Sequence, residues 1–277
     1  MKSYDIVVCF GTWELLEVLT AARLARKPCV LDLHETFSGT GGNKILNLLS
    51  RFLSGVIATS AGAANPIHST VKRCVVPRPV SLTRFLPEPH QVRAQNSLAI
   101  VGQVVPHKRV LKLLEAVDAV EDFTLSVSIV GISPLGFRSS YEQVVSRHAE
   151  KSRHQIVLVD KTDNVAEHLK NAYVVVNVSE HEAFGRTVIE GLAAGCFPIV
   201  SSGTGTEEIV VRAGVGWVVS DAGGSLSEAI RRYFILPELT KSEMSVEATQ
   251  SAQKYASDLI AGEYLSALKK MGVFGAA

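Results

Sequence analysis

The residues best suited to chemistry lie between Asn177 and Gly195, where a glycine and an arginine follow a predicted strand. We expect the strand to end near Val178 and a helix to begin near Gly185. The first turn of a helix presents unpaired backbone N–H groups and a partial positive charge, so it favours a phosphate group. Gly185 would let an oxygen-rich ligand approach the backbone, and Arg186 could add a charge-assisted hydrogen bond. The segment therefore predicts a phosphate-binding helix start.

Two carboxylates belong to the same segment. Glu182 lies in the predicted loop and Glu190 in the predicted helix, with seven residues between them. A carboxylate in this helix can accept hydrogen bonds from both hydroxyls of a ribose, whereas the loop carboxylate can face a sugar. Two glutamates at this spacing carry no information by themselves. A solvated loop and helix start in an unrelated α/β protein is the alternative that these residues leave open.

The elements that must position these residues follow from hydrophobic patterning. Runs that are apolar at consecutive positions are typical of strands buried on both faces of a parallel sheet, and their alternation with helices predicts a doubly wound α/β fold. The predicted strands are residues 6–10, 29–33, 56–59, 75–76, 98–101, 125–130, 156–159, 173–178, 197–201 and 217–219. The predicted helices include residues 15–26, 44–53, 111–120 and 187–194, and one last helix over about 246–270.

A stretch between Pro77 and Asn96 divides the chain, because it holds four prolines and a polar run that resist helix and strand. We predict a first domain over residues 1–90, a second over 91–250 and a terminal helical segment over 251–277. Ligands of open α/β sheets bind at the carboxyl ends of the strands. Two such domains with a cleft between them would suit a large polar ligand.

Composition narrows the class of protein. The chain is 47% hydrophobic and 20% charged, as in globular proteins, and its formal net charge of +1 gives no case for nucleic acid. Residues 1–90 carry ten Lys and Arg against six Asp and Glu. This excess could serve an acidic membrane surface or an anionic acceptor. Chance variation is the simpler explanation, since no run of about 5–8 basic residues is present.

The cysteines and the N-terminus indicate a cytoplasmic protein. Asp5 and Glu14 interrupt any signal-peptide core, and the longest apolar runs have the length of strands, so no membrane span is expected. The cysteines are widely spaced, which suggests free buried thiols rather than zinc ligands or disulfides. They are Cys9, Cys29, Cys74 and Cys196.

The 177–210 context resembles the retaining GT-B glycosyltransferases of family 4, the group 1 type. The likeness rests on the two glutamates, Phe-Gly after the first of them, a helix of small residues, the strand Phe197–Ser201, and a glycine-rich loop followed by Glu-Ile at 202–210. The resemblance implies two Rossmann-like domains facing a cleft, with residues 1–90 as a reduced acceptor-side domain and 91–250 binding a nucleotide sugar. It also implies that residues 251–277 form a helix crossing back to the first domain.

The resemblance further implies a reaction. A sugar would move from a nucleoside-diphosphate donor to a glycan, lipid or small-molecule acceptor with retention of configuration. No metal and no cofactor other than the donor substrate would be required. In the segment Leu98–Ala116, Gly102 ends a strand and Lys108 stands where the family has a lysine that neutralises the leaving diphosphate. Gln103 departs from the family's arginine and carries no charge.

Either Arg109 or Arg186 could compensate for Gln103; otherwise stabilisation of the leaving group is weaker. The residue after the strand 29–33, His34, resembles the family's histidine that faces the donor sugar, although a lone histidine is more often structural. The resemblance assigns catalytic roles to His34, Lys108 and Glu182. It assigns donor binding to Gly102, Gln103, Lys108, Phe184, Gly185, Arg186, Thr187 and Glu190.

The family's usual first strands and their glycine-rich loop have no counterpart in this sequence. Either the acceptor domain is minimal, or the missing piece comes from another chain. A non-catalytic or partner-dependent subunit is therefore the main alternative. An epimerase or phosphorylase on the same architecture and a plain ligand-binding module are further rivals. The sequence leaves open the sugar, the base, the acceptor and the oligomeric state.

Overall fold

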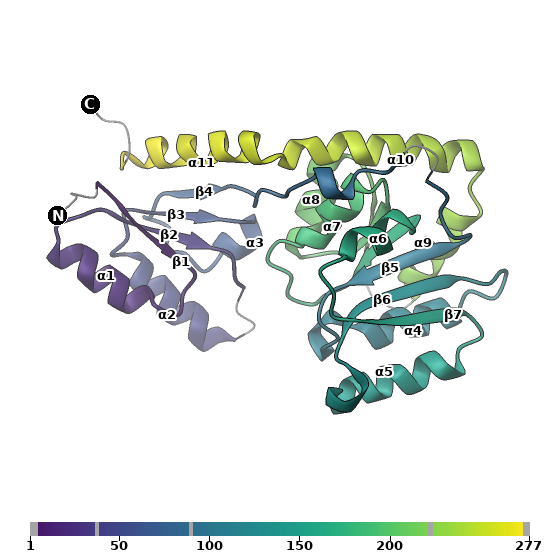
Figure 1. The fold of residues 1–277 in the computed structure, drawn as a ribbon. Coiled ribbons are helices and arrows are strands. Elements are labelled where there is room, and N and C mark those ends of the chain that lie inside the picture. Colours follow the sequence, from purple (N-terminus) through teal and green to yellow (C-terminus); the bar gives the residue numbers. More distant parts are fainter. Residues whose placement is uncertain (1–4, 37–38, 89–90, 221–223, 274–277) are drawn as a thin grey trace. The chain divides into compact units, whose positions relative to one another are not determined.

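The computed structural model describes residues 5–36, 39–88, 91–220 and 224–273. The chain forms two compact units (Figure 1). Unit 1 comprises Met1–Pro79, His181–Phe184 and Tyr255–Ala277, and unit 2 comprises Val80–Glu180 and Gly185–Lys254. The first division, after Pro79, falls in the proline-rich stretch. Both units are built on a parallel sheet, which confirms the predicted doubly wound α/β fold.

Unit 1 has a four-stranded sheet in the order β1-β2-β3-β4. Its strands are β1 (Val7–Phe10), β2 (Cys29–Leu33), β3 (Gly55–Ala58) and β4 (Arg73–Val75). Its helices are α1 (Leu15–Leu24), α2 (Thr40–Ser50), α3 (Ala61–Ala64) and α11 (Ser257–Met271).

Helices cover both faces of this sheet. Leu31 of β2 belongs to an apolar cluster with α1 and α2, whereas its neighbour Val30 belongs to a cluster with α11. Successive residues of a strand point to opposite faces, so a strand covered on both sides is apolar at consecutive positions. This explains why the run at 29–33, apolar at every position except Asp32, predicts β2 correctly.

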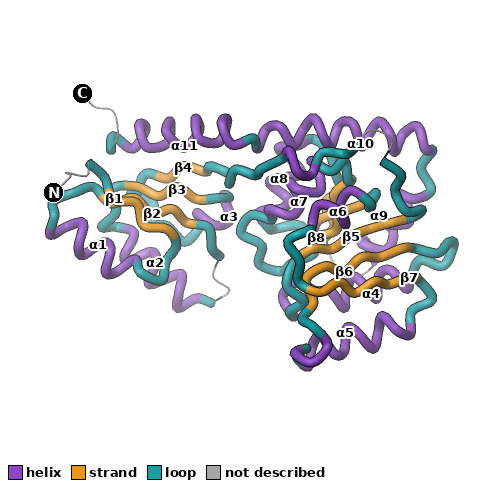
Figure 2. The backbone as a smooth tube through the Cα atoms, viewed as in Figure 1, coloured by secondary structure: helices purple, strands orange, loops and turns teal. Residues whose placement is uncertain are grey.

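Unit 2 has a six-stranded sheet in the order β10-β9-β8-β5-β6-β7, of which β8, β5, β6 and β7 are labelled in Figure 2. The strands are β5 (Ser97–Val101), β6 (Ser126–Ile132), β7 (Gln155–Asp160), β8 (Val174–Asn177), β9 (Phe197–Ser201) and β10 (Trp217–Val219). β5 pairs with both β6 and β8. The strand order therefore reverses at β5 and β8, and the crevice at their carboxyl ends is where open α/β sheets bind ligands.

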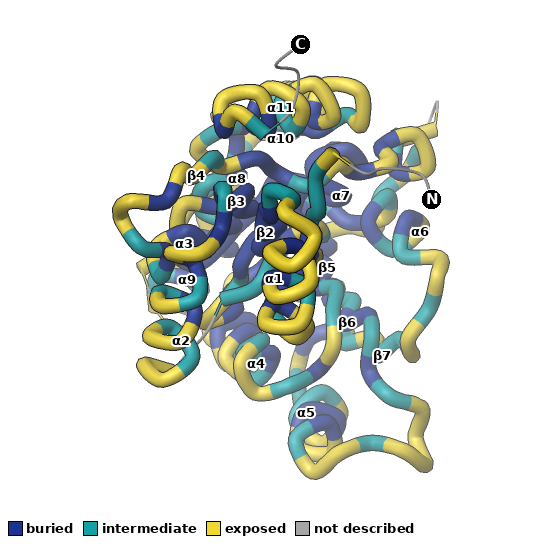
Figure 3. The backbone as a smooth tube through the Cα atoms, turned by 90° about the vertical axis from the view of Figure 1, so that its left-hand side faces the viewer, coloured by how far each residue is buried: buried dark blue, intermediate teal, exposed yellow. Residues whose placement is uncertain are grey.

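The helices of unit 2 connect these strands. They are α4 (Val110–Asp118), α5 (Ser140–Lys151), α6 (Val165–Lys170), α7 (Arg186–Ala193), α8 (Gly205–Ala213), α9 (Gly224–Phe234) and α10 (Glu238–Ala252). Single 3₁₀ turns occur at Thr83–Phe85, Pro106–Lys108, Leu135–Phe137 and Gln253–Tyr255. In Figure 3 the outward face of α1 is exposed, whereas the strand β2 behind it is buried. Within the described ranges, no helix combines the length and apolarity that crossing a membrane requires.

Several predicted elements differ from the structure, among them β4, α2 and the last helix. β4 begins two residues before the predicted strand at 75–76, and α2 begins at Thr40 rather than at residue 44. The single helix predicted over about 246–270 is wrong, because α10 ends at Ala252 and α11 begins at Ser257. The ammonium of Lys254 donates to the carbonyls of Arg212 and Ala213 at the end of α8. Such tertiary contacts override a helical pattern that contains no proline or glycine at this point.

Candidate functional site

The start of α7 in unit 2 has the geometry expected of a phosphate-binding helix. Gly185 is its N-cap residue, with φ of 87°, a left-handed conformation that glycine adopts at little cost. The N–H of Val188 donates to the carbonyl of Gly185, whereas the N–H groups that precede it come before the first hydrogen bond of the helix. Arg186 and Thr187 follow in this turn, and Arg186 is exposed. The predicted helix start is thus correct to one residue.

A buried carboxylate lies one turn into the same helix. Glu190 is 6% exposed, and its Oε1 accepts a hydrogen bond of 2.9 Å from Nε of Arg186. Among the described residues, Arg186 is the one side chain that the structure bonds to Glu190. Burial raises the pKa of Glu190, against the opposing effect of Arg186 and Arg84. Because Arg186 is 62% exposed, a bound ligand could replace it at modest cost.

A small pocket lies at the carboxyl ends of β5 and β8 in unit 2. It is lined by Gly102, Gln103 and Lys108 together with Asn177 and Ser179. Three of the predicted donor-binding residues therefore share one hollow at the reversal of strand order. Gln103 is exposed and Lys108 is half-buried there.

The two arginines that could replace the missing charge at Gln103 are both engaged within unit 2. Arg109 donates from Nε and Nη2 to Oε1 of Glu180, at 3.0 and 2.7 Å. Arg186 is paired with Glu190. The charge of each arginine is thus offset by a carboxylate in the ligand-free structure.

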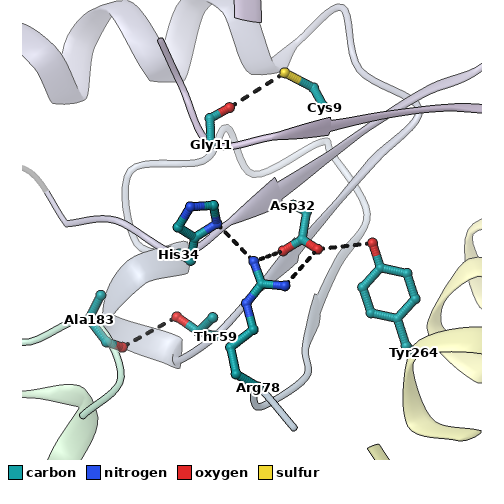
Figure 4. Close-up of polar contacts among 8 residues, drawn as sticks. All are labelled: Cys9, Gly11, Asp32, His34, Thr59, Arg78, Ala183 and Tyr264. Carbon is teal, nitrogen blue, oxygen red and sulfur yellow. Dashed lines mark hydrogen bonds and ion pairs between the residues drawn. The ribbon is translucent and has the colours of Figure 1, made fainter. Parts of the chain in front are cut away.

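In unit 1, a polar cluster surrounds the carboxyl end of β2 (Figure 4). Asp32 is 2% exposed and receives hydrogen bonds from Nη2 and Nη1 of Arg78 at 2.8 and 3.1 Å. The hydroxyl of Tyr264, on α11, donates to Oδ2 of Asp32 at 3.0 Å. Nη2 of Arg78 also lies 2.8 Å from Nδ1 of His34. Burial raises the pKa of Asp32, although Arg78, Tyr264 and His34 oppose this effect.

Loops of unit 1 surround His34. The hydroxyl of Thr12 donates to Oε2 of Glu35 at 2.6 Å. The stretch His181–Phe184, which carries the predicted site residues Glu182 and Phe184, belongs to this unit. The hydroxyl of Thr59 donates to the carbonyl of Ala183 at 3.4 Å (Figure 4). Glu182 itself is half-buried.

The predicted site residues therefore fall into three groups. Gly102, Gln103 and Lys108 line one pocket of unit 2, and Gly185, Arg186, Thr187 and Glu190 form the start of α7. His34, Glu182 and Phe184 lie in unit 1. The roles assigned to all of them remain predictions.

The polar network behind His34 is absent from the sequence-based prediction. Asp32, Arg78 and Tyr264 form it, and Thr12 and Glu35 form a separate pair. One signal could have revealed it: Asp32 interrupts an otherwise apolar buried strand, and a buried carboxylate needs a partner. Nothing in the sequence pattern points to Arg78 or Tyr264 as that partner.

Comparisons with known proteins identify the family and the fold. The family model described as "Glycosyl transferases group 1" matches residues 86–254. No sequence among the curated proteins shows significant similarity to the chain.

Solved structures share the fold across nearly the whole chain. HepE from Anabaena, in complex with UDP and glucose, has a TM-score of 0.82 at 17% identity, with 96% of this chain and 78% of HepE covered. Sucrose-phosphate synthase from Thermosynechococcus elongatus has a TM-score of 0.79 at 17% identity, with 97% and 74% covered. A glycosyltransferase from Rickettsia africae has a TM-score of 0.77 at 17% identity, with 97% and 77% covered.

These likenesses show the GT-B fold that the sequence predicts. The family match covers more than half of the chain and includes the pocket residues and α7. The protein belongs to the group 1 glycosyl transferases and has a GT-B fold.

Proposed function

We propose that the protein transfers a sugar from a nucleoside-diphosphate donor to a glycan, lipid or small-molecule acceptor, with retention of configuration. The observation that carries the proposal is the start of α7, where a phosphate-binding geometry at Gly185 stands one turn from the buried Glu190. This helix lies within the region that matches the family. The complex of HepE with UDP and glucose supports a uridine nucleotide as the first donor to test.

In this proposal the residues of unit 2 hold the nucleotide part of the donor. The backbone N–H groups at Gly185 and the ammonium of Lys108 offset the charge of the departing diphosphate. Glu190 accepts hydrogen bonds from the ribose hydroxyls after Arg186 moves aside. The acceptor oxygen bonds to the anomeric carbon, the bond between that carbon and the diphosphate oxygen breaks, and the acceptor hydroxyl passes its proton to the departing diphosphate. His34 and Glu182 contact the transferred sugar.

Titration of the purified protein with UDP, GDP, ADP and their common sugars tests the donor site. A ligand that binds only the folded state raises the melting temperature, and calorimetry gives its affinity. One nucleotide is expected to bind, with affinity about tenfold or more weaker in Glu190→Gln, because the amide accepts at one oxygen instead of two. Glu150→Gln, on the exposed side of α5, is the matched control and should bind like the wild type.

Other outcomes point to other functions. No binding at millimolar nucleotide would contradict the proposal and favour a subunit that requires a partner. Conversion of the donor without acceptor would indicate an epimerase, and dependence on phosphate would indicate a phosphorylase. The stereochemistry of the isolated product decides between retention and inversion.

We also propose that unit 1 contacts an anionic membrane surface through α1 and α2. Exposed apolar side chains gather on these helices, and Trp13 is 92% exposed. The others are Leu16 and Leu24 on α1, Ile45 and Leu48 on α2, and Phe52 just after α2. Lys44 and Arg51 are exposed on α2 and beside its end, and residues 39–54 contain no acidic residue. On α2, apolar groups among cations suit an interface with anionic lipid, whereas the exposed Glu14 and Glu17 leave α1 to contribute apolar contact.

Co-sedimentation with vesicles tests this contact. The protein is expected to bind phosphatidylglycerol vesicles and to leave phosphatidylcholine vesicles in solution. The variant Lys44→Glu/Arg51→Glu should lose binding, whereas Lys151→Glu/Lys161→Glu, at exposed positions of unit 2, should retain it. Equal binding by the two variants, or none by the wild type, would contradict the proposal.

A further inference from the structure

The buried Asp32 fixes the position of Arg78 in unit 1. Two nitrogens of the guanidinium donate to the two carboxylate oxygens, and this bidentate geometry leaves the arginine little freedom. Tyr264 donates to the same carboxylate. The side chain of Arg78 is 29% exposed, so it reaches from the protein interior to the surface beside His34.

The contact between Arg78 and His34 restricts the histidine to one tautomer. A guanidinium group has five N–H donors and no acceptor, so a nitrogen 2.8 Å from Nη2 must offer a lone pair. Nδ1 of His34 is that nitrogen, and it therefore carries no proton. In a neutral imidazole the proton is then on Nε2.

The Nε2 side of the His34 ring faces Gly11, which has no side chain. A Cβ placed on Gly11 would lie 3.5 Å from both Cε1 and Nε2 of His34, and 3.3 Å from Oε1 of Glu35. Gly11 has φ of 79°, and its N–H donates to the carbonyl of Asp32. Glycine at this position keeps the Nε2 edge of His34 uncovered on that side.

We propose that Arg78, held by Asp32, is a positioning residue that keeps His34 in its Nε2–H form, so that His34 donates a hydrogen bond to an oxygen of the transferred sugar. The identity of the ligand as a sugar rests on the proposed function, whereas the tautomer of His34 does not. His34 then acts as a donor to sugar oxygens, and it does not act as a base through Nε2. Glu35, held by Thr12, supplies an acceptor beside it.

Nitrogen NMR of the ligand-free protein tests the tautomer directly. Labelled imidazole nitrogens distinguish a protonated from an unprotonated ring nitrogen, and His34→Gln identifies the signals of His34 among the eight histidines. The expected result at neutral to mildly alkaline pH is a protonated Nε2 and an unprotonated Nδ1. A protonated Nδ1, or an averaged mixture of both tautomers, would overturn the proposal.

Three variants separate positioning from folding. Arg78→Met removes all donors and should turn His34 into a mixture of tautomers. Because a single replacement strands a buried carboxylate, Asp32→Leu/Arg78→Met removes both charges and should give the same mixture in a protein that still folds. Tyr264→Phe removes another hydrogen bond from Asp32 but leaves Arg78 and His34 in contact, so it should retain the Nε2–H form. An unchanged tautomer in both Arg78 variants would contradict the proposal.

Kinetics show whether the tautomer matters for the reaction. Arg78→Met is expected to raise KM for the donor sugar about tenfold, as the loss of one hydrogen bond to an oriented donor would. The same replacement in a His34→Ala background should add little, because Arg78 acts through His34. If the effects of Arg78→Met and His34→Ala on KM were additive, Arg78 would not act through His34. A protein without any transferase activity would refute the proposed function but leave the NMR result intact.

Discussion

Unit 1 buries the carboxylate of Asp32 and unit 2 that of Glu190, and these two groups are partnered in different ways. Asp32 in unit 1 accepts hydrogen bonds from both ends of the Arg78 guanidinium and from Tyr264. Glu190 in unit 2 accepts one hydrogen bond, from the exposed Arg186. Burial raises the pKa of both carboxyl groups. The protein thus opposes the cost of burial with three hydrogen bonds in unit 1 and with one in unit 2, where a ligand can supply more.

This difference separates a carboxylate that supports the fold from one that binds a ligand. A carboxylate whose oxygens are all engaged supports its neighbours, and its removal should affect folding first. A buried carboxylate with one exposed partner can accept further hydrogen bonds from a ligand, so its removal should affect ligand binding first.

Stability gives the largest expected contrast between them. Asp32→Ala should lower the free energy of unfolding by about 3–5 kcal/mol, because it leaves Arg78 without its carboxylate. Glu190→Gln should change it by less than about 1 kcal/mol, because the lost partner is a surface cation. Urea unfolding at neutral pH measures both.

The control for this contrast is Asp258→Asn, at an exposed position of unit 1, which should have a small effect. Asp32→Leu/Arg78→Met should recover most of the stability lost in Asp32→Ala. Similar losses in Asp32→Ala and Glu190→Gln would remove the proposed distinction between the two units.

Turnover gives the next contrast, and it concerns the pocket of unit 2. Lys108→Ala should lower kcat about a hundredfold, as expected when a charge that stabilises a leaving group is removed, with a smaller change in donor affinity. Its stability should change little. Lys112→Ala, in the adjacent helix α4, removes an exposed lysine paired with Glu115 and is the matched control. Equal kinetics in the two variants would exclude Lys108 from the reaction.

A gain of charge should have a smaller effect at the same pocket. Gln103→Arg adds a cation to a side chain that lines the pocket beside Lys108. We expect kcat to rise about tenfold, because Arg109 is paired with Glu180 and a second cation beside Lys108 would offset more of the diphosphate charge. Gln143→Arg on α5 controls for net charge. A fall in kcat would show that the uncharged residue suits the donor of this protein.

The sequence predicts the parts of the site that are local in the chain. Gly185 and Glu190 lie within one loop and helix, so a strand end, a glycine and a helical run suffice to place them. β2 is predicted because it is apolar at every position but one. Asp32 is that exception, and its partners Arg78 and Tyr264 are 46 and 232 residues away. No local pattern encodes such a pairing, because tertiary structure alone brings the three residues together.

The prediction of helix ends is limited in the same way, because tertiary contacts decide some of them. The chain between α10 and α11 has no proline or glycine, and the 3₁₀ turn at Gln253–Tyr255 depends on contacts made elsewhere in the fold. By contrast, Ser139 and Glu142 form a capping box at the start of α5, a pattern that is local in the chain.

The pH dependence of stability gives the smallest contrast, and Glu142 provides its reference within unit 2. Burial raises the pKa of Glu142, but hydrogen bonds from Ser139 and Ser133 outweigh this effect and hold the pKa at about 2. Its contribution is therefore present above the ordinary value of 4.5 and is lost as the pH falls toward 2. Glu142→Gln should cost about 1–2 kcal/mol at neutral pH, since an amide accepts from only one of the two backbone N–H groups. That cost should shrink on acidification.

Glu190 should show the opposite sign. Its pKa is higher in the folded protein than in the unfolded chain, so ionisation of Glu190 destabilises the folded state as the pH rises through its folded pKa. Relative to the wild type, Glu190→Gln should therefore gain stability as the pH is raised above 4.5 and then reach a plateau. Urea unfolding across this range measures both variants. If the two stability differences changed with pH in the same direction, Glu190 could not be the strained carboxylate that a ligand is expected to relieve.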